Sequence, residues 1–398
     1  MKVFVVNCGS SSIKYQLFSM ANETVLAKGI MERVGSEQAV LVHNNHKQQV
    51  VARDHGEGMK IILDMLVDPK IGVIKNVSEI EGVGHRVVHG GEKMSQSCLI
   101  DDAVIDVIRE NCPLGPLHNP ANLSGIKAAV AAMPQVQQVA VFDTAFMATL
   151  PPKAYRYAVP NDWYTTFHVR KYGFHGTSHR YVTLRTAELL GKRVDQVNLI
   201  TVHLGNGCSM TAVANGKAVD HSMGMTPLEG LVMGTRSGDI DPAIVFYMTT
   251  TGGLSPNEVD NALNKQSGLL GVSGLSNDMR DNLAAVEAGN QNSELAVEMF
   301  VYRIVKYIGA YFTITPKLDA IVMTGGIGEN STPIRSKVVK QLSRLGIHID
   351  ADLNAKTTRG KAGPITTPES STPVWVVPTN EELMIARDTQ DIVKGRKK

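Results

Sequence analysis

Apolar residues recur along this chain both as short continuous or alternating runs and at helical spacing, and the mixture predicts an α/β fold. The chain opens with a short apolar run that suits a buried strand, and a second such run follows after a turn. In the first part of the chain, strands are predicted at residues 3–6, 13–18, 82–88 and 136–142, and as several runs within 25–51. Helices are predicted there at residues 58–67, 101–110 and 120–132.

The second part of the chain repeats this opening. Residues 6–10 align with residues 202–206 at one constant offset, so that a strand again runs into a glycine-rich turn. The repeat predicts two domains, which we place at residues 1–145 and 146–382, with a C-terminal helix at 383–398 returning to the first. Further elements are predicted as helices at 177–190 (N-cap Thr177 or Ser178) and 292–314, and as strands at 199–204, 319–324 and 374–377.

The small-residue turn after the first strand is a candidate phosphate site. Such a turn leaves a concave row of backbone N–H donors, to which the hydroxyls of Ser10 and Ser12 can add. Lys14 supplies a cation, and Asn7 supplies a neutral oxygen that can face a metal ion or a water. An ordinary hairpin in a core sheet is the alternative interpretation of this stretch.

Composition narrows the class of protein without identifying its chemistry. The chain has 398 residues, which is enough for two domains of ordinary size, and its net charge of +2 gives no global attraction to nucleic acid or anionic membranes. Any anion site must therefore come from local placement of charge. The four cysteines lack CxxC spacing and the N-terminal apolar run is too short for a signal peptide, so we expect a cytoplasmic protein.

Four side chains in glycine-flanked or strand-end positions are candidates for chemistry on an anion. Arg86 and Arg236 lie in loops between glycines, where a guanidinium can clamp a carboxylate or a phosphate. His175 directly precedes a glycine. Asp143 follows an apolar strand, at the end where ligands of open α/β sheets bind. For each residue alone, a structural salt bridge, a helix cap or a packed histidine remains an alternative.

Motifs spread over nearly the whole chain carry a family resemblance. They are NCGSSSIK, GHRVVHGG, LHNPAN, FDTAF, KYGFHGTSHRY, HLGNG, GMTPLEGLVMGTRSGDIDP, GGIGEN and TNEEL. With them the chain resembles the sugar-kinase/heat-shock/actin superfamily, and more narrowly the acetate kinase family. The resemblance implies two duplicated ribonuclease-H-like domains of the actin-like ATPase fold, with a nucleotide cleft between them.

The activity that this resemblance implies is the reversible, ATP-dependent phosphorylation of acetate to acetyl phosphate. A propionate kinase or another short-chain carboxylate kinase is the near alternative, because it would share every catalytic residue. A nucleotide-driven protein of the actin or chaperone kind is the distant alternative, but it does not account for Arg86, His175 and Arg236. The implied partners are ATP or ADP and acetate or acetyl phosphate, without nucleic acid or membrane, and the implied assembly is a homodimer.

The resemblance also implies a role for each matching residue. His175 and Arg236 stabilise the transferring phosphoryl group. For Asp143, the position at a strand end leaves two roles, orienting the carboxylate or its clamping arginine, or handling a proton. We favour the orienting role, because a carboxylate nucleophile is already deprotonated at pH 7. Arg86 binds the acyl carboxylate. The apolar residues around the alkyl end of the acid are Val88, Leu117, Phe174 and Pro227.

The implied nucleotide and metal sites draw on both halves of the chain. The nucleotide positions are Ser10, Ser12, Lys14, His203, Leu204, Gly205, Asn206, Gly207, Asp278, Met279, Arg280, Gly326, Ile327, Gly328, Glu329 and Asn330. The metal positions are Asn7 and Glu381. One amide and one carboxylate suffice for magnesium, which keeps most of its waters, and manganese is the alternative ion.

Overall fold

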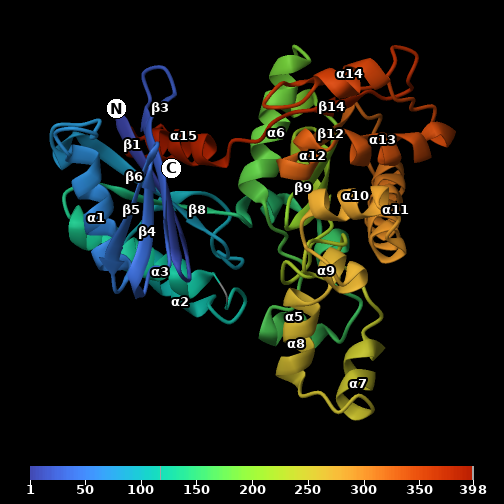
Figure 1. Cartoon of the computed structure of the whole chain (residues 1–398), viewed down its shortest axis with the longest axis horizontal. Coiled ribbons are helices and arrows are strands. Elements are labelled where there is room, and N and C mark those ends of the chain that lie inside the picture. The colour runs from blue at the N-terminus through green and yellow to red at the C-terminus, as the bar shows by residue number, and fades with distance from the viewer. Residues whose placement is uncertain (117, 397–398) are drawn as a thin grey trace. The chain divides into compact units, whose positions relative to one another are not determined.

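The computed structural model describes residues 1–116 and 118–396, which divide into two compact units (Figure 1). The first unit comprises residues 1–146 and the segment that begins at Asn380, and the second comprises residues 147–379. Our sequence-based boundary placed residues up to 382 in the second domain. The structure instead assigns Glu381 to the first unit, because it begins helix α15, which packs against strands of that unit.

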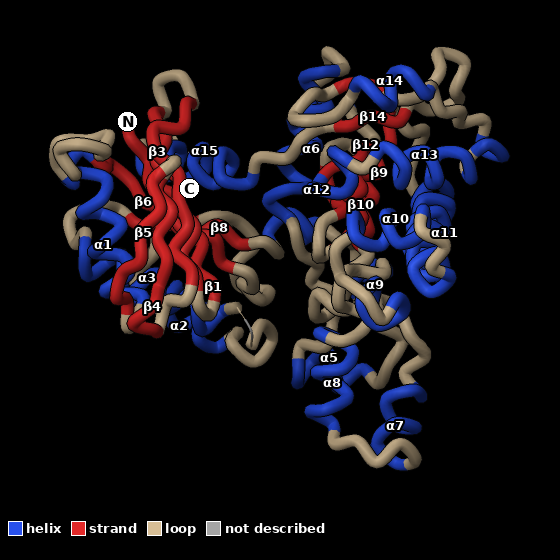
Figure 2. Tube along the Cα trace, in the orientation of Figure 1, coloured by secondary structure: helices blue, strands red, loops and turns tan. Residues whose placement is uncertain are grey.

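The first unit is built on an eight-stranded sheet with the order β5-β4-β3-β2-β1-β6-β8-β7 (Figure 2). Strands β1 to β5 pair antiparallel, whereas β6 runs parallel to both β1 and β8. The strands are β1 (Lys2–Gly9), β2 (Ser12–Ser19), β3 (Thr24–Glu32), β4 (Ser36–His43), β5 (His46–Ala52), β6 (Ile80–Val87), β7 (Cys98–Leu99) and β8 (Gln138–Phe142). The short runs within residues 25–51 are therefore confirmed as strands.

Helices cover both faces of this sheet. The helices of the first unit are α1 (His55–Val67), α2 (Asp102–Glu110), α3 (Asn119–Ala132) and α15 (Glu381–Val393). On one face, Phe4 of β1 shares a core with Met59 of α1 and Ala129 of α3. On the other face lies α15, so close that a side chain at Gly84 of β6 would collide with Thr389.

The second unit repeats the sheet of the first. Its six strands have the order β11-β10-β9-β12-β14-β13. Within it, β11-β10-β9 are antiparallel and β9, β12 and β14 are parallel, as are β3-β2-β1 and β1, β6 and β8 in the first unit. The strands are β9 (Leu199–Leu204), β10 (Cys208–Ala214), β11 (Lys217–His221), β12 (Ala320–Thr324), β13 (Gly363–Pro364) and β14 (Val374–Val376). The predicted duplication is confirmed.

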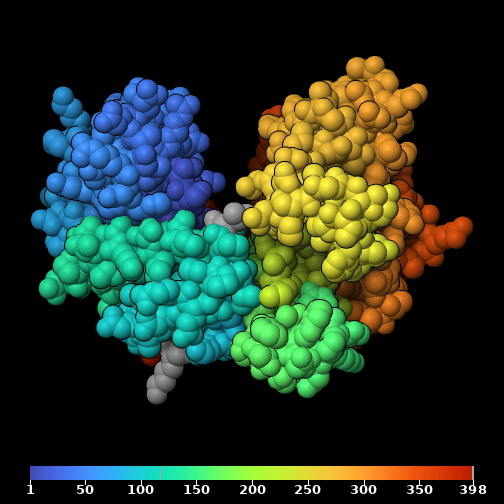
Figure 3. Space-filling model, turned by 90° about the horizontal axis from the view of Figure 1, so that it is seen from below, coloured from blue at the N-terminus to red at the C-terminus, as the bar shows by residue number. Residues whose placement is uncertain are grey.

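Helices make up most of the rest of the second unit. They are α4 (Pro152–Tyr155), α5 (Asn161–Phe167), α6 (Gly176–Leu189), α7 (Ala243–Thr250), α8 (Pro256–Lys265), α9 (Gly268–Ser273), α10 (Met279–Glu287), α11 (Gln291–Ile314), α12 (Gly325–Asn330), α13 (Thr332–Gln341) and α14 (Ala351–Lys356). The segment around α7 and α8, yellow in Figure 3, lies at the surface of this unit. Within the described part of the chain, no helix is both long enough and apolar enough to cross a membrane.

Local sequence signals predicted the start of one helix correctly and the start of another wrongly. Asp101 caps α2 by accepting a hydrogen bond from the backbone N–H of Val104, as a side-chain cap should. The prediction that Thr177 or Ser178 caps α6 is wrong, because the helix already begins at Gly176 with His175 as its N-cap. The GGIGEN stretch forms the short helix α12.

Candidate functional site

Strand alternation brings several candidate residues of the first unit to one face of its sheet. Asn7 of β1 pairs with Lys14 of β2, and Val5, two residues earlier on β1, pairs with Gly84 of β6. Arg86 lies two residues beyond Gly84, and side chains two apart on a strand point to the same face. This is the face that α15 covers. The polar ends of β1, β2 and β6 therefore share a face with α15, away from the core shared with α1 and α3.

Arg86 is held by Asp143 in a buried ion pair. Its Nε and Nη2 both donate to Oδ2 of Asp143, at 3.0 and 2.6 Å. The Asp143 side chain is only 1% exposed and that of Arg86 is 25% exposed. The adjacent Asp143 carboxylate raises the pKa of Arg86 above its usual value, so the guanidinium stays charged. Anchored in this way, Arg86 presents a cation of fixed orientation to the face that Asn7 and Lys14 share.

Glu381, the first residue of α15, is a half-buried carboxyl group beside this pair. Burial raises its pKa to about 7; Arg86 opposes the shift, while Asp143 and Glu382 add to it. Its carboxylate and the amide oxygen of Asn7 are hard oxygen ligands, so their chemistry fits magnesium. Across residues 1–116 and 118–396, no group of three or more His, Cys, Asp or Glu could hold a metal ion.

Two buried asparagines that our sequence analysis did not single out fix the backbone after β6. Asn122 accepts the Val88 N–H at 3.1 Å and donates to the Cys8 carbonyl at 2.8 Å, which links the first hairpin to Val88. Asn119 accepts the next backbone N–H along the chain at 3.0 Å. Both belong to the LHNPAN motif, which was the available signal. Leu117 of the same motif lies outside the described residues.

His175 adopts an unusual backbone conformation in the second unit. It lies in the left-handed region, with φ 55° and ψ 27°, at the start of α6. A non-glycine residue there is held by its surroundings and is often functional. The Nδ1 atom of His175 lies 2.8 Å from the Ser209 hydroxyl, and its ring stacks on His203 with ring centres 4.4 Å apart. The imidazole is therefore fixed in both position and tilt.

Arg236 and His175 meet beside Gly207 in the second glycine-rich turn. A side-chain carbon built on Gly207 would lie 3.3 Å from both Arg236 Nη1 and His175 Cε1. Within the described chain, no carboxylate lies at ion-pair distance from Arg236, and burial lowers the pKa of its guanidinium below the usual value. A half-buried arginine without an acidic neighbour, beside a fixed histidine, is a site that favours an anion.

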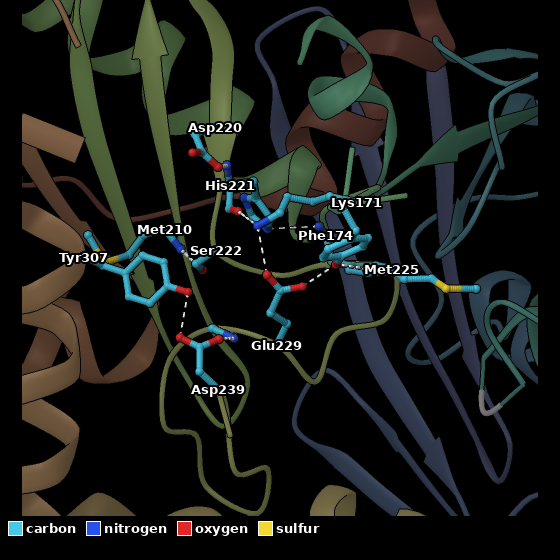
Figure 4. Close-up of polar contacts among 12 residues, drawn as sticks. Lys171, Phe174, Met210, Asp220, His221, Ser222, Met225, Glu229, Asp239 and Tyr307 are labelled. Atoms are coloured by element: carbon cyan, nitrogen blue, oxygen red, sulfur yellow. Dashed lines mark hydrogen bonds and ion pairs between the residues drawn. The ribbon is translucent and has the colours of Figure 1, made fainter. Parts of the chain in front are cut away.

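Figure 4 shows how the loop that carries Phe174 is anchored. The Lys171 ammonium donates to the His221 carbonyl at 2.8 Å and pairs with Glu229 at 3.1 Å. His221 Nε2 accepts the Phe174 N–H at 3.1 Å, so its proton must lie on Nδ1, which donates to Thr211. Burial keeps the pKa of His221 well below its usual value, in agreement with this neutral form.

A second set of contacts fixes the loop that carries Pro227 and Arg236. Asp239 accepts the Gly230 N–H at 2.7 Å and the hydroxyl of Tyr307, on α11, at 2.9 Å (Figure 4). Arg236 Nη1 donates to the Pro227 carbonyl at 3.4 Å. The structure therefore brings Pro227, Arg236 and the His175 segment together within one unit.

A pocket of about 630 Å³ lies next to this group in the second unit. The predicted nucleotide residues that line it are Gly205, Asn206, Asp278, Met279, Arg280, Gly326, Ile327 and Asn330. Sequence reasoning missed four further lining residues, which flank the same motifs: Asn277, Leu283, Ser331 and Pro333. The volume and the mixture of apolar and polar walls suit a small organic ligand of nucleotide size.

The other predicted nucleotide residues are not among those that line this pocket. Ser10, Ser12 and Lys14 belong to the first unit. The His203 ring bonds to the Ser178 hydroxyl, and Leu204 is fully buried. Gly207 faces His175 and Arg236, and Gly328 is buried. The Glu329 carboxylate accepts the backbone N–H groups of Gly325 and Thr379, so it holds the chain directly before the segment that returns to the first unit.

Comparison with known proteins identifies relatives over the full length of the chain. The model of the acetokinase family matches residues 2–387. An acetate kinase of Thermotoga maritima is 55% identical over 399 aligned positions, covering 99% of each chain.

Solved structures agree with the sequence matches. The acetate kinase of Porphyromonas gingivalis is 48% identical, with a TM-score of 0.94 over 98% of this chain and 99% of that one. A propionate kinase of Francisella tularensis is 42% identical, with a TM-score of 0.92 over the same shares. The fold thus extends to relatives with two different acyl substrates.

Proposed function

The chain belongs to the acetokinase family, and from that premise we propose that it transfers the γ-phosphoryl group of ATP to the carboxylate of acetate. The products would be acetyl phosphate and ADP, and the reaction would be reversible. The observation that carries the proposal is the meeting of His175 and Arg236 beside Gly207, in the unit that also holds the nucleotide-sized pocket. Phosphoryl transfer depends mainly on alignment and on cations around the transferring group.

The remaining roles follow from the chemistry of each side chain. Arg86, oriented by Asp143, would hold the acetate carboxylate, which needs no general base because it is already ionised at neutral pH. His175 and Arg236 would donate to the phosphoryl oxygens as charge redistributes. Val88, Phe174 and Pro227 would surround the methyl group.

Magnesium is the metal ion that the candidate site fits. Glu381 and Asn7 would hold it, with water as the remaining ligands, and manganese could occupy the same oxygen site. When bound, the ion would neutralise phosphate charge and help to orient the phosphate chain. Lys14 and the hydroxyls of Ser10 and Ser12 would add donors on the same hairpin.

A direct assay separates the proposed activity from its alternatives. Purified protein with ATP, magnesium and hydroxylamine should form acyl hydroxamate from acetate, with stoichiometric release of ADP. A higher kcat/KM for propionate would make the chain a propionate kinase, an activity that the Francisella tularensis relative makes a specific alternative. ATP hydrolysis without any acyl product would instead support the actin- or chaperone-like alternative.

Val88 offers a test of acyl selectivity. A valine should leave room for a methyl group and crowd an ethyl group, and one methylene in an apolar pocket is worth about 1–3 kcal/mol. We therefore expect detectable propionate turnover in the wild type and a shift towards propionate and butyrate in Val88→Ala. The measurement is kcat/KM for the three acids with both proteins. Unchanged kcat/KM ratios among the three acids would contradict the assignment of Val88 to the acyl pocket.

Glu381 offers a test of the metal site. Glu381→Gln keeps the size of the side chain and removes its charge, so the magnesium concentration for half-maximal rate should rise by about 10-fold or more. Glu369→Gln, a change at an exposed glutamate of the second unit, is the matched control and should leave that concentration unchanged. A normal magnesium dependence in Glu381→Gln would contradict the assignment.

The proposal also includes a cytoplasmic homodimer, which the resemblance implies. One surface that suits self-association lies on α7, where Ile244, Phe246 and Tyr247 are 43, 69 and 63% exposed. Large apolar side chains gathered on one exposed helix are typical of protein–protein contact surfaces.

A further inference from the structure

Two histidines of the second unit share one serine hydroxyl. The Ser209 Oγ atom lies 2.8 Å from His175 Nδ1 and also 2.8 Å from His179 Nε2. A hydroxyl carries a single proton and can donate to only one of these nitrogens. The other nitrogen must itself carry a proton and donate it to the serine oxygen. The ring-proton positions of His175 and His179 are therefore coupled.

The chain of hydrogen bonds continues on the far side of His179. Its Nδ1 lies 2.7 Å from the Thr201 hydroxyl, and the ring is fully buried. Burial, with smaller contributions from His221 and His203, holds the pKa of His179 well below its usual value, so the ring is neutral and has one proton. That proton lies either on Nδ1 or on Nε2, which gives the whole chain two possible directions.

The distances favour one direction. If Thr201 donates to His179, its proton lies in a 2.7 Å contact, and His179 then donates to Ser209, which donates to His175 Nδ1. In the opposite direction, Thr201 must place its proton on the Thr211 carbonyl, 3.4 Å away, at the weak end of the hydrogen-bond range.

Charged and titratable groups lie on several sides of His175. Arg236 and His175 both lie beside Gly207, and His203 is stacked against the His175 ring. His179 is linked to His175 through Ser209 and in turn contacts His221. Nε2 is the His175 nitrogen on the Gly207 side, 3.4 Å from the position of a side-chain carbon there, so a ring with its single proton on Nε2 has its donor on that side.

We propose that Thr201, His179 and Ser209 form a directed hydrogen-bond chain that keeps the proton of His175 on Nε2. The three are positioning residues, since they act through His175 and set which of its nitrogens can donate. The functional meaning of the chain rests on the role proposed above for His175, in which that nitrogen donates to a phosphoryl oxygen. No proton moves in this arrangement; the chain selects a tautomer before the substrate binds.

The test measures the tautomer directly, on the intact protein without substrate. In ¹⁵N-histidine-labelled protein, with the His175 signals assigned by comparison with His175→Gln, we expect the Nε2–H form of His175. Thr201→Val keeps the shape of the side chain and removes its hydroxyl, so His175 should become a mixture of tautomers. Thr201→Ser, which keeps the hydroxyl, should restore the wild-type spectrum.

Kinetics and a matched control complete the design. Thr201→Val and Ser209→Ala should lower kcat by about 10-fold, with the KM values for ATP and acetate nearly unchanged, because one oriented hydrogen bond is weakened. Thr186→Val is the control, since this buried threonine donates to the Val182 carbonyl of its own helix. It should leave both the spectrum and kcat unchanged.

The outcomes separate this inference from the proposed function. An Nδ1–H tautomer in the wild type, or a wild-type His175 spectrum in Thr201→Val, would overturn the directed chain. The expected spectra combined with an unchanged kcat in both variants would support the chain and overturn the catalytic role of His175.

Discussion

Replacing Arg236 with alanine is expected to lower kcat by about 10² to 10³, the usual cost of removing one donor aimed at charge in a transition state. The structure gives the reason. The guanidinium is half-buried, lies beside His175 at Gly207, and has no carboxylate at ion-pair distance within the described chain. In the role proposed for Arg236, its charge would therefore be available to the phosphoryl group, whose oxygens need it most during transfer.

The kinetic pattern distinguishes this role from simple anchoring of a substrate. Arg236→Ala should affect mainly kcat, whereas Arg86→Ala should also raise the KM for acetate, because Arg86 is the proposed carboxylate ligand. Arg236→Lys should recover only part of the rate, since an ammonium lacks the guanidinium fork. Arg193→Ala, at a side chain 75% exposed on the same unit, is the control and should behave as the wild type. If both Arg236→Ala and Arg86→Ala lost only affinity for ATP, these arginines would have to be assigned to nucleotide binding instead.

Prediction from the sequence was most accurate for elements whose structure follows from the local pattern of residues. The alternating runs within residues 25–51 are strands, and the apolar stretch at 292–314 is α11, because alternation and helical spacing follow directly from which face is buried. The aligned turns at residues 6–10 and 202–206 both lie in strand hairpins of matching sheets. A duplicated motif is informative because two copies must satisfy the same backbone geometry.

Sequence failed where tertiary contacts override local signals. Thr177 and Ser178 have good cap chemistry, but α6 begins earlier because the left-handed backbone of His175 already turns the chain. Ser178 instead bonds His203 and Thr379, which is 201 residues away. No local sequence pattern predicts such a distant partner. The polar network around His175 therefore forms only when β9, β10 and α6 pack together.

Arg335 is the clearest residue that sequence could not assign. It stands in an ordinary helical stretch, where an arginine normally reaches solvent, yet it is fully buried. Its Nε donates to Asn354 Oδ1 at 2.8 Å, and its Nη groups donate to the carbonyls of Glu329, Asn354 and Thr357 at 2.6 to 2.9 Å. Burial lowers its pKa to about 10, so it remains charged at neutral pH. One side chain thus joins α12, which lines the nucleotide-sized pocket, to α14.

Replacing Arg335 with methionine is therefore expected to lower the free energy of unfolding of the second unit by about 3–5 kcal/mol. Methionine fills similar space but leaves buried carbonyl oxygens without donors, and each such group costs about 1–3 kcal/mol. Because the chain has two units, urea denaturation should be followed together with hydrogen exchange in α12 and α14. Faster exchange there should accompany a higher KM for ATP, since α12 carries Gly326 and Ile327 of the pocket.

The matched control for this prediction is Arg344→Met, which makes the same change at an exposed arginine of the same unit. It should shift the free energy of unfolding by no more than about 0.5 kcal/mol. Arg335→Lys separates charge from geometry, because an ammonium keeps the charge but cannot reach acceptors on α12 and α14 at once, so most of the destabilisation should remain. If Arg335→Met unfolds at the same urea concentration as Arg344→Met, the buried contacts of Arg335 contribute nothing net, and α12 must be held by its packing alone.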